Sequence, residues 1–239
     1  IIAFFIVHFG NLSVTHLGFI IPGFPDLVLS PFYRDLFSTL SLVGLINAFN
    51  MMDGLNGLLG SLALTIALIF LSLGIYHHIE IVIILSALMI GAMMAFLYFN
   101  FPRKKTHPDL IFLGDTGSTL IGFMCYWMTI ELTRLPQSTI PPIMLVWCIA
   151  LPLFDMLRVM IKRLHLKKTI TAPDQIHFHH ILLSEGWSPQ FIVFLTIIMT
   201  LIFSAIGALA LYQPITGPFL FFGFWVIFVL YQQRMQGFK

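Results

Sequence analysis

The chain has 239 residues, of which 59% are hydrophobic and only 9% are charged, and its formal net charge is +2. Soluble domains carry about 25% charged residues, so much of this chain must be solvated by lipid rather than by water. The small net charge gives no reason to expect nucleic acid as a partner. The composition therefore predicts a single integral-membrane domain over residues 1–239.

Seven apolar segments are long enough to cross a membrane as helices, and a shorter one opens the chain. They lie at 36–52, 57–76, 79–100, 116–133, 141–161, 190–212 and 217–232, after the partial segment 1–9. Each run is continuous, whereas the strands of a membrane β-barrel alternate apolar and polar residues. We therefore expect an all-α polytopic transmembrane bundle with about seven full spans plus an N-terminal partial span. The first segment is too short to cross the hydrocarbon core, so we expect further sequence upstream of Ile1.

The basic residues indicate how these segments are oriented, because cytoplasmic loops of membrane proteins are enriched in Lys and Arg. If the segments alternate in direction, only Arg34 and Arg134 fall on one side of the membrane. The basic residues on the other side are Arg103, Lys104, Lys105, Arg158, Lys162, Arg163, Lys167, Lys168, Arg234 and Lys239. We expect this second side, with the loops 53–56, 101–115 and 162–189, to face the cytoplasm.

A first polar motif, NAFNMMDGLNG over residues 47–57, stands where one predicted span ends and the next begins. Asn50 and Asp53 are three residues apart, so they share one face if helical geometry continues to this point. Gly57 would allow another group to approach closely. The alternative is an ordinary turn in which Asp53 caps the next helix.

A second polar motif, FLGDTGST over residues 112–119, places Asp115 directly before a predicted span. The free N–H groups and the positive dipole end of a helix can bind a phosphate there. Taken alone, an ordinary helix cap is the commoner role for such an aspartate. However, Asp53 and Asp115 fall on the same predicted membrane face, and Asn50 adds an amide oxygen. Such a set of oxygen atoms suits a hard cation such as Mg²⁺.

A third motif, PDQIHFHH over residues 173–180, carries three histidines in a loop that also contains Lys167 and Lys168. Zinc ligands usually come from well-separated positions, and His179 and His180 would point in different directions on a helix. We interpret the motif as a phosphate or nucleotide contact, because imidazoles donate hydrogen bonds and can become cationic near neutrality. A solvated loop with incidental histidines is the alternative.

Other polar or reactive residues have a simpler interpretation. Asp155 and Arg158 lie three residues apart near the inner end of the segment 141–161, and they could pair across one helical turn. We interpret this pair as mainly structural. Cys125 and Cys148 lie in apolar runs without metal-ligand spacing, so we expect both to be buried packing residues.

The segments NAFNMMDGLNG, FLGDTGSTLIGF and PDQIHFHH resemble, in order and in predicted location, motifs of the polyprenyl-phosphate N-acetylhexosamine-1-phosphate transferases. The resemblance covers almost the whole chain and is strongest to bacterial members. It implies transfer of N-acetylglucosamine-1-phosphate from UDP-N-acetylglucosamine to undecaprenyl phosphate, with UMP as the second product. This reaction would begin a cell-surface polysaccharide of the O-antigen or enterobacterial common antigen type. The resemblance also implies Mg²⁺ as cofactor, with Mn²⁺ as a substitute, and an active site on the cytoplasmic side of the bacterial inner membrane.

The same resemblance implies roles for individual residues. Asp115 matches the family's Mg²⁺-binding aspartate, and Asn50 and Asp53 match its catalytic metal and phosphate site. The implied substrate-binding residues are Asn56, Asn100, His177, His179, His180, Lys167 and Lys168. The implied partners are UDP-N-acetylglucosamine, undecaprenyl phosphate and membrane lipids, and a homo-oligomer is left open.

The chain departs from the family's pattern at three places. Asn56 stands where bacterial members usually carry a second aspartate, and Gln175 replaces a common arginine. The family's adjacent Asp-Asp pair belongs upstream of the matched region, and no such pair occurs in this sequence. An inactive remnant of the enzyme and a relative that uses another UDP-N-acetylhexosamine are therefore alternatives. A transporter is a weaker one, because transporters place polar residues near the bilayer midplane.

Overall fold

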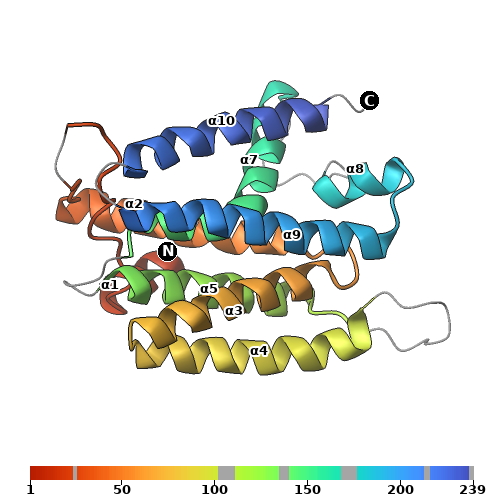
Figure 1. The fold of residues 1–239 in the computed structure, drawn as a ribbon, viewed down its shortest axis with the longest axis horizontal. Helices are drawn as coiled ribbons and strands as arrows, with labels where there is room; N and C mark the ends of the chain where they lie inside the picture. The colour runs from red at the N-terminus through yellow and green to blue at the C-terminus, as the bar shows by residue number, and fades with distance from the viewer. Residues whose placement is uncertain (24–25, 102–110, 135–139, 168–176, 213–215, 237–239) are drawn as a thin grey trace.

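The structure is a computed structural model, and it describes residues 1–23, 26–101, 111–134, 140–167, 177–212 and 216–236. Within these ranges the secondary structure is helical, apart from one isolated bridge between His16 and Val28. The predicted all-α class is therefore confirmed. Most of the long helices run along the longest axis of the molecule, and the helix labelled α7 crosses them (Figure 1).

The helices follow one another along the described part of the chain. Their bounds are α1 Ile2–Phe9, α2 Pro31–Met51, α3 Leu58–Tyr76, α4 Glu80–Asn100, α5 Gly114–Arg134, α6 Pro142–Cys148, α7 Ala150–His165, α8 Phe178–Ser184, α9 Pro189–Ala208, the 3₁₀ helix η1 Leu209–Tyr212, and α10 Thr216–Gln236. Each of the seven predicted spans falls on one of these helices or on a consecutive pair. The short helix α8 lies inside the segment 162–189 that was predicted to be a loop.

Not all of these helices are equally suited to a lipid environment. By length and apolarity, α3, α4, α9 with η1, and α10 could each cross a membrane, and α6 with α7 could form a fifth span. α2 and α5 are less apolar, because both contain several hydroxyl, amide or charged side chains. The polytopic helical class is thus confirmed, and the number of seven spans stays a prediction.

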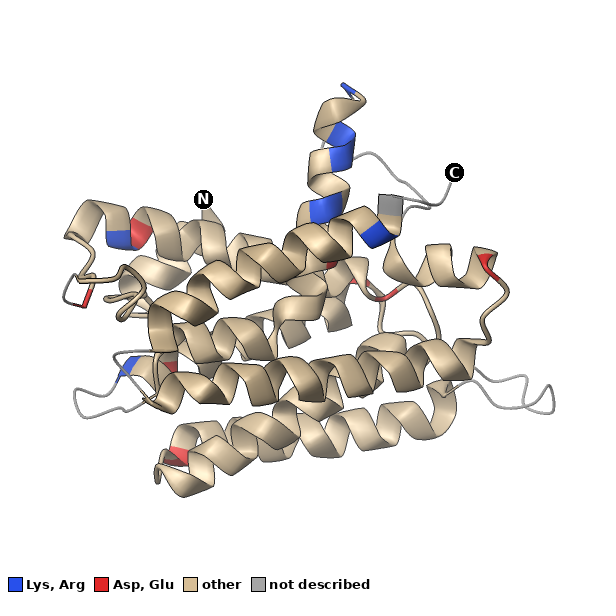
Figure 2. Ribbon diagram, turned by 45° about the horizontal axis from the view of Figure 1, so that its top comes forward, with Lys and Arg blue, Asp and Glu red and all other residues tan. Residues whose placement is uncertain are grey.

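The prediction of one continuous helix over 141–161 is wrong. α6 ends at Cys148, α7 begins at Ala150, and the two helices are bent by 77°. Pro152 explains the break, because proline lacks a backbone N–H and its ring clashes with the carbonyl four residues earlier, here that of Cys148. α7 then continues past the predicted end to His165. Figure 2 shows the basic residues along the part of this helix that projects from the bundle.

An aromatic cluster fixes α7 against α9 and α10. The ring centroid of Phe154 lies 5.7 Å from that of Phe203 on α9 and 4.7 Å from that of Phe224 on α10. Trp147 of α6 contacts the same two rings. Such aromatic contacts add to the free energy gained by burying apolar area. The cluster therefore holds the following residue, Asp155, inside the bundle.

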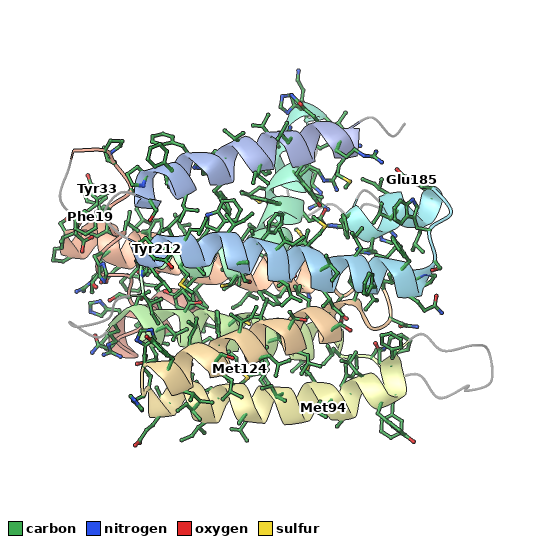
Figure 3. The ribbon with its side chains drawn as sticks, viewed as in Figure 1. Phe19, Tyr33, Met94, Met124, Glu185 and Tyr212 are labelled. Carbon is green, nitrogen blue, oxygen red and sulfur yellow. The ribbon has the colours of Figure 1, made fainter. Side chains whose placement is uncertain are left out.

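The alternating helix directions gather the polar motifs at one end of the molecule. The C-terminal ends of α2, α4 and α10 and the N-terminal ends of α3, α5 and α9 lie together there (Figure 1). Glu185, which follows α8, lies at this end, whereas Phe19, Tyr33 and Tyr212 lie at the other (Figure 3). We call the end that carries Glu185 and the turn 52–57 the site end. The flanks between the two ends expose large apolar side chains, which lipid would cover.

Candidate active site

The contact between α2 and α5 sets the position of the first site residues. A Cβ atom on Gly122 would lie 2.8 Å from the Ile46 Cα, so the two helix backbones touch at this point. The two helices run in opposite directions (Figure 1). One helical turn after Ile46 comes Asn50, and one turn before Gly122 comes Ser118. The close approach therefore sets a register that places Asn50 beside the start of α5.

The Asn50 side chain joins the two helices by hydrogen bonds. Its Nδ2 donates to Asp115 Oδ1 at 3.2 Å and to Ser118 Oγ at 2.9 Å. The Ser118 hydroxyl donates to the Gly114 carbonyl at 3.1 Å, within its own first helical turn. Asn50 thus faces Asp115 with its amide nitrogen, which positions the carboxylate. The expected contribution of the Asn50 oxygen to the oxygen set stays a prediction.

Ser118 was not among the residues predicted for the site. The sequence contained a signal for it, because Ser118 lies three residues after Asp115 and therefore on the same face of a helix that begins at Gly114. What the sequence could not show was its partner, Asn50, which is 68 residues away.

Asp53 lies in the turn that follows α2. Its backbone N–H donates to the Asn50 carbonyl at 3.1 Å, so the chain is still turning as it does in a helix. Burial and the negative charge of Asp115 raise the pKa of the Asp53 carboxyl to about 6. Asn50 contacts both residues, through its carbonyl to the Asp53 N–H and through its amide to Asp115, so the two carboxylates, which we call the acidic pair, lie near each other. A bound cation would offset the repulsion.

The acidic pair fits an open site for a hard cation. Mg²⁺ usually binds one or two protein carboxylates and completes its octahedral shell with waters and substrate phosphates. Within the described ranges, no group of three or more His, Cys, Asp or Glu side chains is arranged to enclose a metal ion. The acidic pair can supply two carboxylates to such a site, and the identity of the cation stays a prediction.

Asn100 ties the turn at 52–57 to the segment that leads into α5. Its Oδ1 accepts a hydrogen bond from the Gly57 N–H, and its Nδ2 donates to the Ile111 carbonyl, both at 2.6 Å. The Asn100 side chain and Gly57 are buried, so the bond to the Gly57 N–H is shielded from water, whereas Ile111 is exposed. Gly57 has a φ of 79°, a conformation that glycine adopts without strain. This geometry supports a positioning role for Asn100, while Asn56, half-buried beside Gly57, stays a predicted substrate contact.

The histidine motif, His177, His179 and His180, lies at the start of α8 and reaches the turn that carries Asp53. A Cβ atom on Gly54 would overlap the His179 ring, so this imidazole packs directly on the turn. The ring centroids of His179 and His180 are 4.2 Å apart. Three motifs that are far apart in the sequence therefore meet at the site end.

Burial affects the charge that two of these histidines, His179 and His180, can carry. Burial and the neighbouring His180 lower the pKa of His179 to about 3, so its imidazole is neutral near pH 7. Burial and His177 also lower the pKa of His180. Both His179 ring nitrogens are buried and have no hydrogen-bond partner among the described residues. A neutral ring of this kind can donate or accept a hydrogen bond but brings no positive charge to a phosphate.

The remaining predicted residues are less informative. Lys167 is exposed just beyond the end of α7, where its φ of 53° ends the helical run. Lys168 and Gln175 lie outside the described residues. Cys125 and Cys148 are buried and unpaired with each other, as predicted for packing residues.

Comparisons with known proteins agree with this arrangement. The chain is 37% identical over 226 residues to the undecaprenyl-phosphate alpha-N-acetylglucosaminyl 1-phosphate transferase of Escherichia coli O157:H7. That match covers 93% of this chain and 58% of the relative. A protein of the same name from Salmonella typhi is 34% identical over 235 residues, which is 97% of this chain and 60% of the relative.

A relative from a third species is similar to the chain to about the same degree. The probable undecaprenyl-phosphate N-acetylglucosaminyl 1-phosphate transferase of Bacillus subtilis (strain 168) is 34% identical over 201 residues, or 81% of this chain and 51% of that protein. The chain therefore spans between 51% and 60% of the length of these relatives. Residues 1–133, which carry the motifs of Asp53 and Asp115, match the family model for glycosyl transferase family 4. The chain belongs to glycosyl transferase family 4.

Proposed function

We propose that the whole protein transfers N-acetylglucosamine-1-phosphate from UDP-N-acetylglucosamine to undecaprenyl phosphate. The products are undecaprenyl-pyrophosphoryl-N-acetylglucosamine and UMP. The observation that carries this proposal is the meeting of the acidic pair, Asp53 and Asp115, with the buried imidazole of His179 at one end of an apolar bundle. The printed names of the similar proteins describe a transfer of this kind.

The acidic pair is the proposed site for Mg²⁺, with Mn²⁺ as a substitute. A divalent cation there neutralises phosphate charge that develops during phosphoryl transfer. Asn50 donates a hydrogen bond to the Asp115 carboxylate, and its second bond, to the Ser118 hydroxyl, holds the amide in place. Asp53, with a pKa of about 6, is largely ionised at pH 7 and is therefore ready to act as a ligand.

The proposed step is a displacement at the sugar-bearing phosphorus of the nucleotide. An oxygen of the lipid phosphate forms a new bond to this β-phosphorus, and the bond from the bridging oxygen to it breaks, so UMP leaves with the electron pair. The lipid phosphate is already largely ionised at pH 7, so the step does not require a general base. The chain's residues therefore act by positioning and by charge.

The phosphates also have hydrogen-bond donors within reach of the acidic pair. α5 begins at Gly114, and the free N–H groups of its first turn can bind phosphate oxygens. The neutral His179 imidazole packs on Gly54 with both ring nitrogens buried, so its proposed role is to support the turn that carries Asp53. Asn56, His177, His180, Lys167 and Lys168 remain proposed contacts to the nucleotide sugar.

The bundle contains an apolar cavity that suits the lipid substrate. An apolar cavity of about 440 Å³ lies between α2, α5 and the bent pair of α6 and α7. Its lining includes Leu40, Leu45, Leu153 and Met156, and a prenyl segment placed there would be shielded from water. The asymmetry of Lys and Arg supports placement in the bacterial inner membrane with the site end in the cytoplasm. Entry of the product into an O-antigen type pathway is part of the same proposal.

The products distinguish this reaction from other glycosyl transfers. The whole protein, in membranes, is incubated with UDP-N-acetylglucosamine, undecaprenyl phosphate and Mg²⁺, and nucleotides and lipids are identified by mass spectrometry. We expect equal amounts of UMP and lipid pyrophosphoryl sugar, and no product after chelation of the metal. Formation of UDP would show transfer of the sugar without its phosphate and would refute the proposal. UDP-N-acetylgalactosamine in place of the donor tests for a different N-acetylhexosamine.

A further inference from the structure

Asp155 is a fully buried carboxylate on α7, within the helix that follows the break in the bundle. It lies 22 residues before His177 in the sequence, and its side chain reaches the start of α8. An isolated carboxylate in such a place would lose much of its solvation free energy, so its retention depends on its partners. Those partners connect three separate helices.

Four groups donate hydrogen bonds to this carboxylate. Oδ2 accepts from His177 Nδ1 at 2.9 Å. Oδ1 accepts from the Phe178 backbone N–H at 2.8 Å, from the Arg158 guanidinium at 3.0 Å and from the Tyr231 hydroxyl at 3.3 Å. The pairing of Asp155 with Arg158 is therefore confirmed, but the carboxylate does more than balance that charge.

The bond to His177 has a consequence for the imidazole. A carboxylate can only accept, so the proton of this bond is on Nδ1. Nε2, on the opposite edge of the ring, is then the nitrogen left for a ligand. The ring plane is fixed as well, because His177 stacks parallel to His179 with an interplanar angle of 6° and a centroid separation of 5.9 Å.

The bond to the Phe178 N–H fixes the start of α8. This N–H belongs to the first turn of the helix and has no partner within α8. His177, the residue before the helix, makes no side-chain cap of its own. Asp155 therefore caps α8 from another helix, and α8 in turn carries His179 onto Gly54. One carboxylate thus determines both the ring of His177 and the place of the helix that bears His179.

We propose that Asp155 is a positioning residue for the sugar-nucleotide site, which orients His177 with Nε2 free for substrate and holds α8 against the turn of Asp53. This inference rests on the proposed function for the identity of the substrate. Tyr231 supports the same carboxylate from α10, so the C-terminal helix contributes to the arrangement. Asp155 itself need not touch substrate, because it acts through His177 and α8.

The test compares Asp155→Asn with a matched control in the whole protein. Asp26 offers that control, because its carboxylate also lies near a histidine, 3.2 Å from His16 Nδ1, and accepts a hydrogen bond from a backbone N–H, that of Gly18. We expect Asp155→Asn to raise the KM for UDP-N-acetylglucosamine at least tenfold with a smaller fall in kcat, and Asp26→Asn to change neither. A folded Asp155→Asn protein with unchanged KM would overturn the proposal.

A spectroscopic measurement is independent of catalysis. In protein labelled with ¹⁵N-histidine, the signal that disappears in His177→Asn reports the protonation of this ring. We expect a proton on Nδ1 in the wild type and loss of that fixed state in Asp155→Asn. A wild-type His177 protonated only on Nε2 would refute the inference, even if Asp155→Asn fails to fold. Absence of transferase activity with the expected Nδ1 signal would instead count against the proposed function.

Discussion

Replacing Asn100 by alanine tests how the two segments that carry Asp53 and Asp115 are held together. The Asn100 amide bonds the Gly57 N–H of the turn that follows Asp53 and the Ile111 carbonyl of the segment that leads to Asp115. Asn100→Ala removes both bonds and leaves the Gly57 N–H buried without a partner, whereas the carbonyl of the exposed Ile111 can bond water. A buried unpartnered group costs about 1–3 kcal/mol, so the free energy of unfolding should fall by about 1–3 kcal/mol. A water molecule that enters the space would bring the loss to the lower end of this range.

The assay is equilibrium unfolding of the whole protein in mixed micelles, followed by circular dichroism. Ser72→Ala is the control, because the Ser72 hydroxyl is exposed and donates only to the Leu68 carbonyl of its own helix. We expect this control to change the free energy of unfolding by less than about 0.5 kcal/mol. The same small change for Asn100→Ala would refute the reasoning, because the buried bond to the Gly57 N–H would then contribute nothing to the fold.

Two further predictions concern the acidic pair and the turn beside it. Asp53 has a pKa of about 6, so protons compete with the cation for this carboxylate below pH 6. The affinity for Mg²⁺ should therefore fall about tenfold per pH unit below pH 6 and stay constant above pH 7. Calorimetric titration from pH 5 to pH 8 measures this, and a flat profile would contradict it. Gly54→Ala should cost about 1–3 kcal/mol of stability, because the new methyl group overlaps the His179 ring. Thermal unfolding of Gly54→Ala is compared with that of Gly223→Ala, because a Cβ atom on Gly223 would meet open space. Equal losses of stability in the two variants would show that the contact between Gly54 and His179 is absent.

The sequence predicted the positions of the helices and the polar residues at their ends. Apolar runs and turn residues located the helices, and the positions of Asn50, Asp53 and Asp115 at their ends followed from those runs. The break between α6 and α7 was missed because every residue around Pro152 is apolar, so hydropathy alone shows one uninterrupted segment. A proline within an apolar run was the available signal, through the hydrogen bond that it removes.

The sequence did not predict which side chains from separate segments contact one another. Asp155 and His177 are 22 residues apart, and the bond between them depends on the bend that carries α7 to the start of α8. The neutrality of His179 likewise depends on burial against Gly54, which no local pattern encodes. Both features arise from packing between helices, so they could be found only with the three-dimensional arrangement.

The most direct test of the central claim is the Mg²⁺ dependence of UMP formation by the whole protein carrying Asp115→Asn. This change keeps the size of the side chain and removes the negative charge that interacts with Asp53. We predict that turnover falls at least a hundredfold at a Mg²⁺ concentration that saturates the wild type, and that more Mg²⁺ restores part of it. An unchanged turnover with an unchanged Mg²⁺ activation curve would contradict the claim that the acidic pair binds the metal.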